Sequence, residues 1–129
     1  MSRVVHFEIQ ADDTERAITF YKEIFDWDFP KYMDNYWGIV TAEKDSKEVG
    51  INGGLLKRPC PAPAPEQGTN AFVCTVQVEN FDEIAEKILK AGGRVAMPKF
   101  ALTGMAWQGY FLDTEGNTFG LHQVDPNAK

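Results

Sequence analysis

The chain has 129 residues, 43% of them hydrophobic and 25% charged, which is typical of one globular domain with a core of its own and not of a disordered chain. A formal net charge of −6 argues against nucleic acid as a partner, because phosphate binding requires a basic surface. No stretch has the length of a signal-peptide core or of a membrane span, so we expect a cytoplasmic protein without a membrane partner.

The first half of the chain predicts one strand, one helix and three further strands. Apolar and polar residues alternate over residues 5–10, which predicts a strand with one apolar and one polar face. Asp12 followed by Glu15 resembles a capping box, and apolar residues at helical spacing then predict a helix over roughly residues 13–25. Three strand-like segments follow, at Trp27–Tyr32, Trp37–Ala42 and Val49–Leu56.

The second half repeats this order. A strand at Phe72–Val78 precedes a second capping box at Asn80 and Glu83, and the helix that follows ends at Gly92 and Gly93. Three strands complete the half, near Arg94–Met97, at Trp107–Asp113 and at Thr118–Val124.

The repeat predicts an α+β fold of two tandem βαβββ modules in a single domain. Module 1 covers about residues 1–57 and module 2 about residues 69–129. The proline-rich stretch between them, about residues 58–68, reads as an extended connector. Because neither module can bury its apolar face alone, we expect a curved mixed sheet around a cleft that holds the function.

The first strand of each module should bury its apolar side against a helix. This predicts burial of six residues: Val5, Phe7, Ile9, Phe72, Cys74 and Val76. The two cysteines, Cys60 and Cys74, form no CxxC pair and indicate no disulfide framework. For Cys74 we expect the role of a small apolar side chain.

Three segments resemble a known superfamily: VHFEIQADDTERAITFY near the start, AGGRV after the second predicted helix, and DTEGNTFGL in the late hairpin. Together they resemble the glyoxalase, bleomycin-resistance and extradiol-dioxygenase superfamily, also called vicinal oxygen chelate proteins. Within it, the chain is most similar to uncharacterised glyoxalase-like proteins whose first strand reads HFEI. The resemblance covers nearly the whole chain and implies the two-module fold, a small-molecule ligand and a homodimer. It implies no single reaction, because the superfamily hosts many chemistries.

The resemblance also implies where a metal would bind. Metal-dependent members carry His, Glu or Gln at four positions, on the first and last strands of each module. His6 matches the first position, whereas Val73 and Gly120 stand at two others and an amide and two glycines, Asn52 to Gly54, stand at the fourth. Divalent ions need three or four convergent N or O ligands. We therefore expect no standard family metal and no other cofactor, and leave a non-standard divalent metal site open.

The candidate site residues are polar or aromatic side chains on the strand faces that should line the cleft. His6 and Glu8, about 6 to 7 Å apart along one strand, are the candidate catalytic residues. The other ligand-binding candidates are Gln10, Asn52, Thr75, Gln77, Trp107, Tyr110 and His122. We expect His6, Glu8 and His122 to converge with at least one of Asn52, Trp107 and Tyr110. The alternatives stay open: a polar row that faces water, a satisfied terminal-strand histidine, and aromatic residues that belong to the core.

Three functions fit these residues. The first is a binding protein that holds a small organic molecule and resembles the drug-sequestering resistance proteins. The second is a lyase or isomerase in which Glu8 takes a proton next to a carbonyl and His6 assists it. The third is a subunit that acts through protein contacts and has a vestigial cleft.

Overall fold

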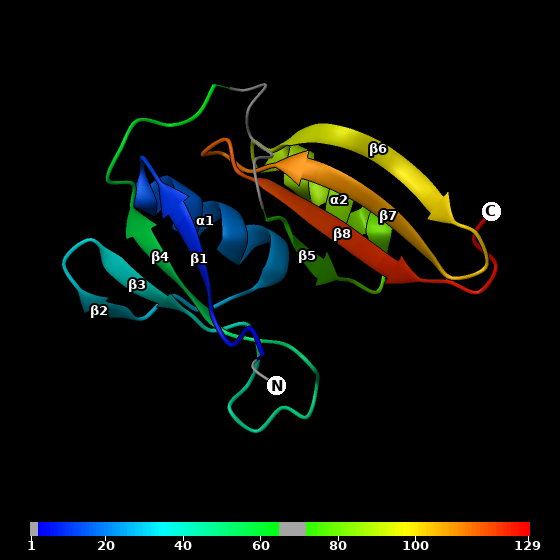
Figure 1. Cartoon of the computed structure of the whole chain (residues 1–129), viewed down its shortest axis with the longest axis horizontal. Coiled ribbons are helices and arrows are strands. Elements are labelled where there is room, and N and C mark those ends of the chain that lie inside the picture. Colours follow the sequence, from blue (N-terminus) through cyan, green and yellow to red (C-terminus); the bar gives the residue numbers. More distant parts are fainter. Residues whose placement is uncertain (1–2, 65–71) are drawn as a thin grey trace. The chain divides into compact units, whose positions relative to one another are not determined.

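The computed structural model describes residues 3–64 and 72–129, and their strands pair as two four-stranded mixed sheets, each with one helix (Figure 1). The chain divides into two compact units, Met1–Ala62 and Pro63–Lys129. Each unit has the order βαβββ, so the prediction of two tandem modules is confirmed. The predicted connector at 58–68 runs into residues 65–71, which lie outside the described residues.

Module 1 forms one sheet in the order β1-β4-β3-β2. Strand β1 is parallel to β4, and the other neighbours are antiparallel. Its elements are β1 (Phe7–Ala11), α1 (Thr14–Phe25), β2 (Lys31–Met33), β3 (Tyr36–Ile39) and β4 (Gly53–Lys57).

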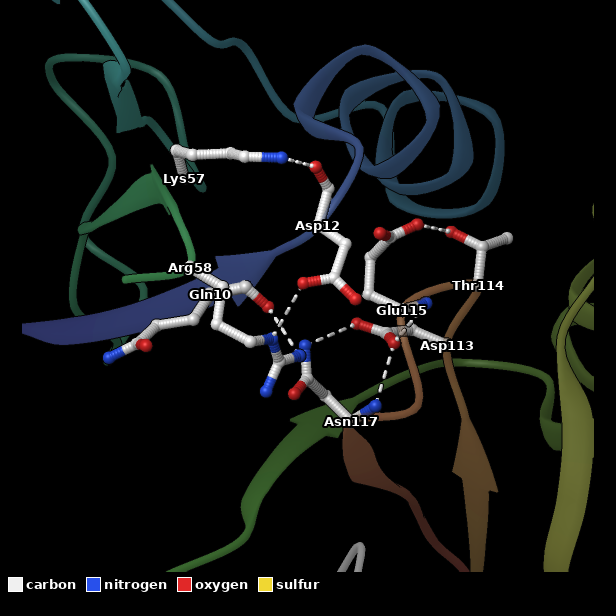
Figure 2. Close-up of polar contacts among 8 residues, drawn as sticks. All are labelled: Gln10, Asp12, Lys57, Arg58, Asp113, Thr114, Glu115 and Asn117. Atoms are coloured by element: carbon white, nitrogen blue, oxygen red, sulfur yellow. Dashed lines mark hydrogen bonds and ion pairs between the residues drawn. The ribbon is translucent and has the colours of Figure 1, made fainter. Parts of the chain in front are cut away.

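The start of α1 differs from the prediction by one residue. Asp13, not Asp12, is the N-cap, and its carboxylate accepts a hydrogen bond from the Arg16 amide at 3.0 Å. The Asp12 carboxylate lies 3.4 Å from Arg58 Nε instead (Figure 2). The two acids are adjacent in sequence, and only the backbone geometry decides which of them reaches the free amides of the first turn.

The helix-facing side of this sheet is the core of module 1. Ala11 and Leu55 from the sheet are fully buried together with Ala17 from α1, and Phe7 and Ile9 pack against them. A fully buried leucine such as Leu55 contributes about 1.5 to 3 kcal/mol, and each alanine contributes less. Alternation along β1 therefore places His6, Glu8 and Gln10 on the opposite face, as predicted. We call that side the polar face of module 1.

Module 2 forms the second sheet, in the order β5-β8-β7-β6. Asn80 caps its helix and accepts a hydrogen bond from the Glu83 amide at 3.1 Å, and Gly92 follows the helix with a φ of 98°. The predicted start and end of this helix are therefore confirmed. Its elements are β5 (Cys74–Gln77), α2 (Phe81–Lys90), β6 (Arg94–Leu102), β7 (Ala106–Leu112) and β8 (Thr118–Val124).

An aromatic row forms the core of module 2. The Phe111 ring centroid lies 6.0 Å from that of Phe81 on α2 and 6.1 Å from that of Phe119 on β8. Ile88 and Leu121 are fully buried beside this row. Helix α2 packs against β6 and β8 of its own sheet, and α1 packs against β4 of its own. Neither helix of the described part is long and apolar enough to cross a membrane.

Three of the six side chains predicted to be buried are exposed instead. Val5 and Phe72, the latter 95% exposed, lie before the strands, which begin only at Phe7 and Cys74. Cys74 is exposed because it lies on β5 at the edge of its sheet, whereas α2 packs mainly against β6 and β8. Of the remaining predictions, Phe7 and Ile9 do pack against the core, and Val76 is half-buried.

A tight turn at DTEGN fixes the pairing of β7 with β8. One Asp113 carboxylate oxygen accepts the amide hydrogens of Glu115 and Asn117, both at 2.8 Å. The other oxygen accepts the Asn117 side-chain amide at 3.2 Å (Figure 2). Because Asp113 is only 5% exposed, these hydrogen bonds offset the cost of burying its charge. The turn thereby sets which β8 residue lies beside each β7 residue.

Candidate functional site

Two glycines lie side by side at the centre of the polar face of module 1. The strand register places Gly54 of β4 beside Glu8 of β1 on one side and beside Gly38 of β3 on the other. A side chain at either position would displace a tyrosine. A Cβ at Gly54 would overlap the Tyr36 hydroxyl, and one at Gly38 would lie 2.7 Å from the Tyr32 ring. The two tyrosines therefore occupy the space that the glycines leave free.

The Tyr36 hydroxyl joins the two candidate catalytic side chains. It lies 3.3 Å from His6 Nε2, which is 3.9 Å from a Glu8 carboxylate oxygen. The His6 and Glu8 side chains are each nearly half exposed. Partial burial raises the pKa of Tyr36 first, and the negative charge of Glu8 and a hydrogen bond to it raise that pKa further. Module 1 thus brings together an acid, a histidine and a phenol around Gly54.

Tyr36 was not among the candidates from the sequence. Its sequence signal is its position two residues before Gly38 on one strand, which places both on the same face. Its partners, however, are Glu8 on β1 and His6 just before that strand, and the alternation within β3 does not identify them. The contact depends on the pairing of three strands.

The other two module 1 candidates have backbone or loop contacts. The Gln10 carbonyl accepts a hydrogen bond from Arg58 Nη2 at 3.1 Å (Figure 2). The Asn52 side-chain oxygen accepts two hydrogen bonds from Thr41, from the amide at 2.9 Å and from the hydroxyl at 3.1 Å. Asn52 therefore ties together the two ends of the loop between β3 and β4, and we leave it out of the proposed site.

Module 2 has an analogous arrangement on the face away from α2. Thr75 of β5 and Tyr110 of β7 flank Gly120 of β8. A Cβ at Gly120 would lie 2.6 Å from the Thr75 hydroxyl oxygen and 3.0 Å from the side-chain nitrogen of Gln108. Again a glycine lies beneath side chains from the neighbouring strands.

The next row of this face holds His122 between Gln77 and Gln108. The Gln108 side-chain oxygen lies 2.7 Å from His122 Nδ1, and Gln108 is only 6% exposed. Gln108 therefore fixes the orientation of the His122 ring. The sequence analysis missed Gln108, although it alternates with Tyr110 in AWQGYFL. Module 2 thus brings Thr75, Gln77, Tyr110 and His122 to one face.

Trp107 lies on the other side of this sheet, which departs from the prediction that grouped it with Tyr110. Its indole nitrogen donates to Asp125 at 2.9 Å, and Lys99 Nζ lies 4.6 Å from its ring centre. The Asn127 amide and then the Trp107 indole lower the pKa of Asp125. Residues three apart on a strand point to opposite faces, so Trp107 and Tyr110 cannot share one. Trp107 therefore has a structural role.

The positions expected for a family metal do not fit a metal. Within residues 3–64 and 72–129, no group of three or more His, Cys, Asp or Glu side chains could hold an ion. Val73 and Gly120 offer no donor atom, and the space beside Gly120 is taken by Thr75 and Gln108. The Tyr36 hydroxyl fills the corresponding space at Gly54. We therefore assign no chemical step to a metal.

A hollow of about 390 Å³ lies elsewhere in module 1. Its lining residues come from α1, from the segment after it and from the end of β3: Lys22, Asp28, Phe29, Pro30 and Val40. None of them is a candidate from the sequence, and none belongs to the polar face. The hollow alone carries no function here.

Comparisons with known proteins agree with the fold. The model of the Glyoxalase/Bleomycin resistance protein/Dioxygenase superfamily matches residues 3–121. CFP32 of Mycobacterium tuberculosis, named as a glyoxylase, is 26% identical over 120 residues, which are 92% of this chain and 44% of CFP32. The chain thus spans less than half the length of this relative.

Solved structures share the fold at low identity. One is a mutant of the fosfomycin resistance protein FosX from Listeria monocytogenes, complexed with Mn(II) and 1S,2S-dihydroxypropylphosphonic acid. It has a TM-score of 0.72 at 18% identity, over 97% of this chain and 92% of FosX. Another is a glyoxalase/bleomycin resistance protein/dioxygenase family enzyme from Burkholderia phytofirmans, with a TM-score of 0.68 at 14% identity over 93% of this chain and 97% of that one.

Replacing Glu8 with Gln should lower the pKa of Tyr36 toward its ordinary value of 10.0. A nearby carboxylate disfavours the phenolate, and the amide removes that charge while partial burial still keeps the pKa raised. Titration of tyrosinate absorbance measures this, with Tyr36→Phe to assign the signal. Glu23→Gln, on the exposed side of α1, is the matched control and should leave the pKa in place. An unchanged pKa in Glu8→Gln would show that Glu8 does not act on Tyr36.

The purified protein should contain no stoichiometric Zn, Ni, Fe or Mn, because two of the four family positions supply no donor atom. Elemental analysis after dialysis measures this content. About one metal per chain, lost in His6→Ala, would overturn the expectation and require a ligand set other than the family's.

Proposed function

Since this chain belongs to the Glyoxalase/Bleomycin resistance protein/Dioxygenase superfamily, we propose that it binds a small organic molecule on the polar face of module 1. The observation that carries the proposal is the convergence of His6, Glu8 and Tyr36 around Gly54. Polar side chains on a strand face are retained against their desolvation cost where a network or a ligand satisfies them.

The chemistry of this face suits a ligand held by a few directed contacts. Glu8 offers carboxylate acceptors, and the Tyr36 hydroxyl and the His6 ring can each donate or accept. Because the His6 and Glu8 side chains remain partly exposed, a ligand could reach them without unfolding the strand. Small-molecule sites commonly combine a few polar groups of this kind with aromatic surface.

The matching face of module 2 supplies further ligand-binding candidates. Thr75, Gln77, Tyr110 and His122 share it, and Gln108 orients the histidine. None of these side chains is a carboxylate. We propose that they contribute neutral hydrogen bonds to a ligand.

A second candidate function is acid–base catalysis of the lyase or isomerase type. The observation that favours it is the contact of one hydroxyl, that of Tyr36, with both His6 and Glu8. In this reaction the Glu8 carboxylate removes a proton next to a substrate carbonyl. His6 or Tyr36 then delivers a proton to the developing oxyanion. A general base must lie within hydrogen-bond reach of its proton, and a strand position fixes Glu8 for that role.

A thermal-shift screen of metabolites and drugs tests both functions. A compound held by this face should raise the melting temperature, since ligand at 100 times its Kd adds about 2.7 kcal/mol of stability. The shift should vanish in the His6→Ala, Glu8→Ala double variant, which should itself remain as stable as the parent. Glu23→Gln is the control that should keep the shift.

The same compound then separates binding from catalysis. If it is only bound, it is recovered unchanged after incubation. If it is turned over, the Glu8→Gln variant should still bind it but should not turn it over. The amide keeps the shape of the side chain but cannot act as a base. A shift that survives the double variant would refute the assignment of the site.

We also propose that the protein is a homodimer. The resemblance to the superfamily supports this. Light scattering should then give a mass of twice the 14.5 kDa chain. A monomer mass at micromolar concentration would contradict this expectation.

The net charge of −6 supports a ligand other than nucleic acid. A cytoplasmic location and the absence of a membrane partner stay predictions.

A further inference from the structure

We propose that the ligand on the polar face of module 1 is a planar organic cation, which stacks on the Tyr32 and Tyr36 rings and pairs its charge with Glu8. This inference rests on the function proposed for the same face. It adds the chemical class of the ligand.

The outer parts of both tyrosine side chains lie over the sheet where two paired glycines leave room for them. Gly38 and Gly54 are register partners. Three atoms of Tyr32, two ring carbons and the hydroxyl, lie 2.7 to 2.9 Å from the Cβ position of Gly38, and the end of the Tyr36 side chain fills that of Gly54. Any larger residue would lift the rings away from the backbone. We call the two rings and the two glycines the tyrosine platform.

The platform offers an aromatic surface that the core does not use. Tyr32 is 65% exposed on β2, an edge strand, and Tyr36 is half-buried beside it. The faces of aromatic rings carry partial negative charge and attract cations. A planar ligand can contact more of two flat rings than a round one can.

The charges near the tyrosine platform favour one sign of charge on the ligand. The carboxylate of Glu8 lies on the face that carries the tyrosines, as does His6. Lys31, next to Tyr32 in sequence, points to the helix-facing side, where its Nζ lies 5.6 Å from the Trp37 ring and 3.8 Å from an Asp34 oxygen. Glu8 and the net charge of −6 therefore favour a cation and repel an anion.

Three probes separate the effect of planarity from that of charge. The first, 1-methylquinolinium, is a planar cation. Quinoline is planar and uncharged near neutral pH, and tetramethylammonium is a cation without a ring. Titration followed by NMR or calorimetry gives the affinity of each for the whole chain. We expect 1-methylquinolinium to bind more tightly than either of the others, because only it satisfies the rings and the carboxylate together.

Substitutions test whether 1-methylquinolinium binds at the tyrosine platform. Tyr32→Leu and Glu8→Gln should each weaken 1-methylquinolinium binding by about threefold to thirtyfold, the range of one cation–π contact or one charge pair. Tyr32→Phe keeps the ring and should bind like the parent. Glu23→Gln removes one charge on α1, and Met105→Ala removes an apolar side chain of similar exposure, 63%, in module 2. Both should leave the affinity within about twofold.

Four results would overturn the proposal. Equal binding of quinoline and 1-methylquinolinium would show that the charge is not recognised. Equal binding by the parent, Tyr32→Leu and Glu8→Gln would show only general attraction of cations to an acidic chain. If a screened metabolite binds in a Glu8-dependent way while 1-methylquinolinium does not, the cation class is wrong and the proposed function stands. If neither binds, both fail.

Discussion

In each module one helix packs against one face of a four-stranded sheet, and this packing determines what the other face can hold. Phe7 and Ile9 must point at α1 to bury their apolar area, so the residues before and between them, His6 and Glu8, must point away. A slip of one residue would bury a carboxylate and expose the core. The hydrophobic packing of β1 therefore holds the candidate site in place without touching it. The polar face is a consequence of the alternation as much as of any requirement for a ligand.

The sequence was sufficient for the repeat, for both helices and for the faces of His6 and Glu8, because these depend on patterns within one segment. It was not sufficient for Tyr36 or Gln108, whose partners lie on other strands and depend on register. Trp107 shows a different kind of error. Its spacing from Tyr110 already places the two on opposite faces, and grouping aromatic residues by type ignored that spacing. The predicted burial of Phe72 and Val5 was wrong because the strands begin two residues later than the apolar pattern does.

The two modules share one backbone arrangement around a glycine but carry different side chains beside it. Each has a glycine on its last strand, Gly54 or Gly120, paired with Glu8 or Thr75 on its first. On the third strand of each module, the residue two positions before the glycine's partner extends over that glycine. It is Tyr36 in module 1 and Gln108 in module 2. Module 1 surrounds the glycine with an acid and aromatic rings, whereas module 2 surrounds it with neutral hydrogen-bonding groups. The two halves thus share this geometry and differ in the side chains around it.

The crowding at Gly120 limits which side chains this position can carry. In metal-dependent relatives the position is expected to carry a glutamate. Here the side chain would collide with Thr75 and Gln108 at its first carbon, because their atoms lie within 3.0 Å of that point. A glutamate here would therefore displace both side chains, and moving Gln108 would break its contact with His122 Nδ1. The residue at position 120 thus determines whether the histidine two residues further along the strand keeps its orientation.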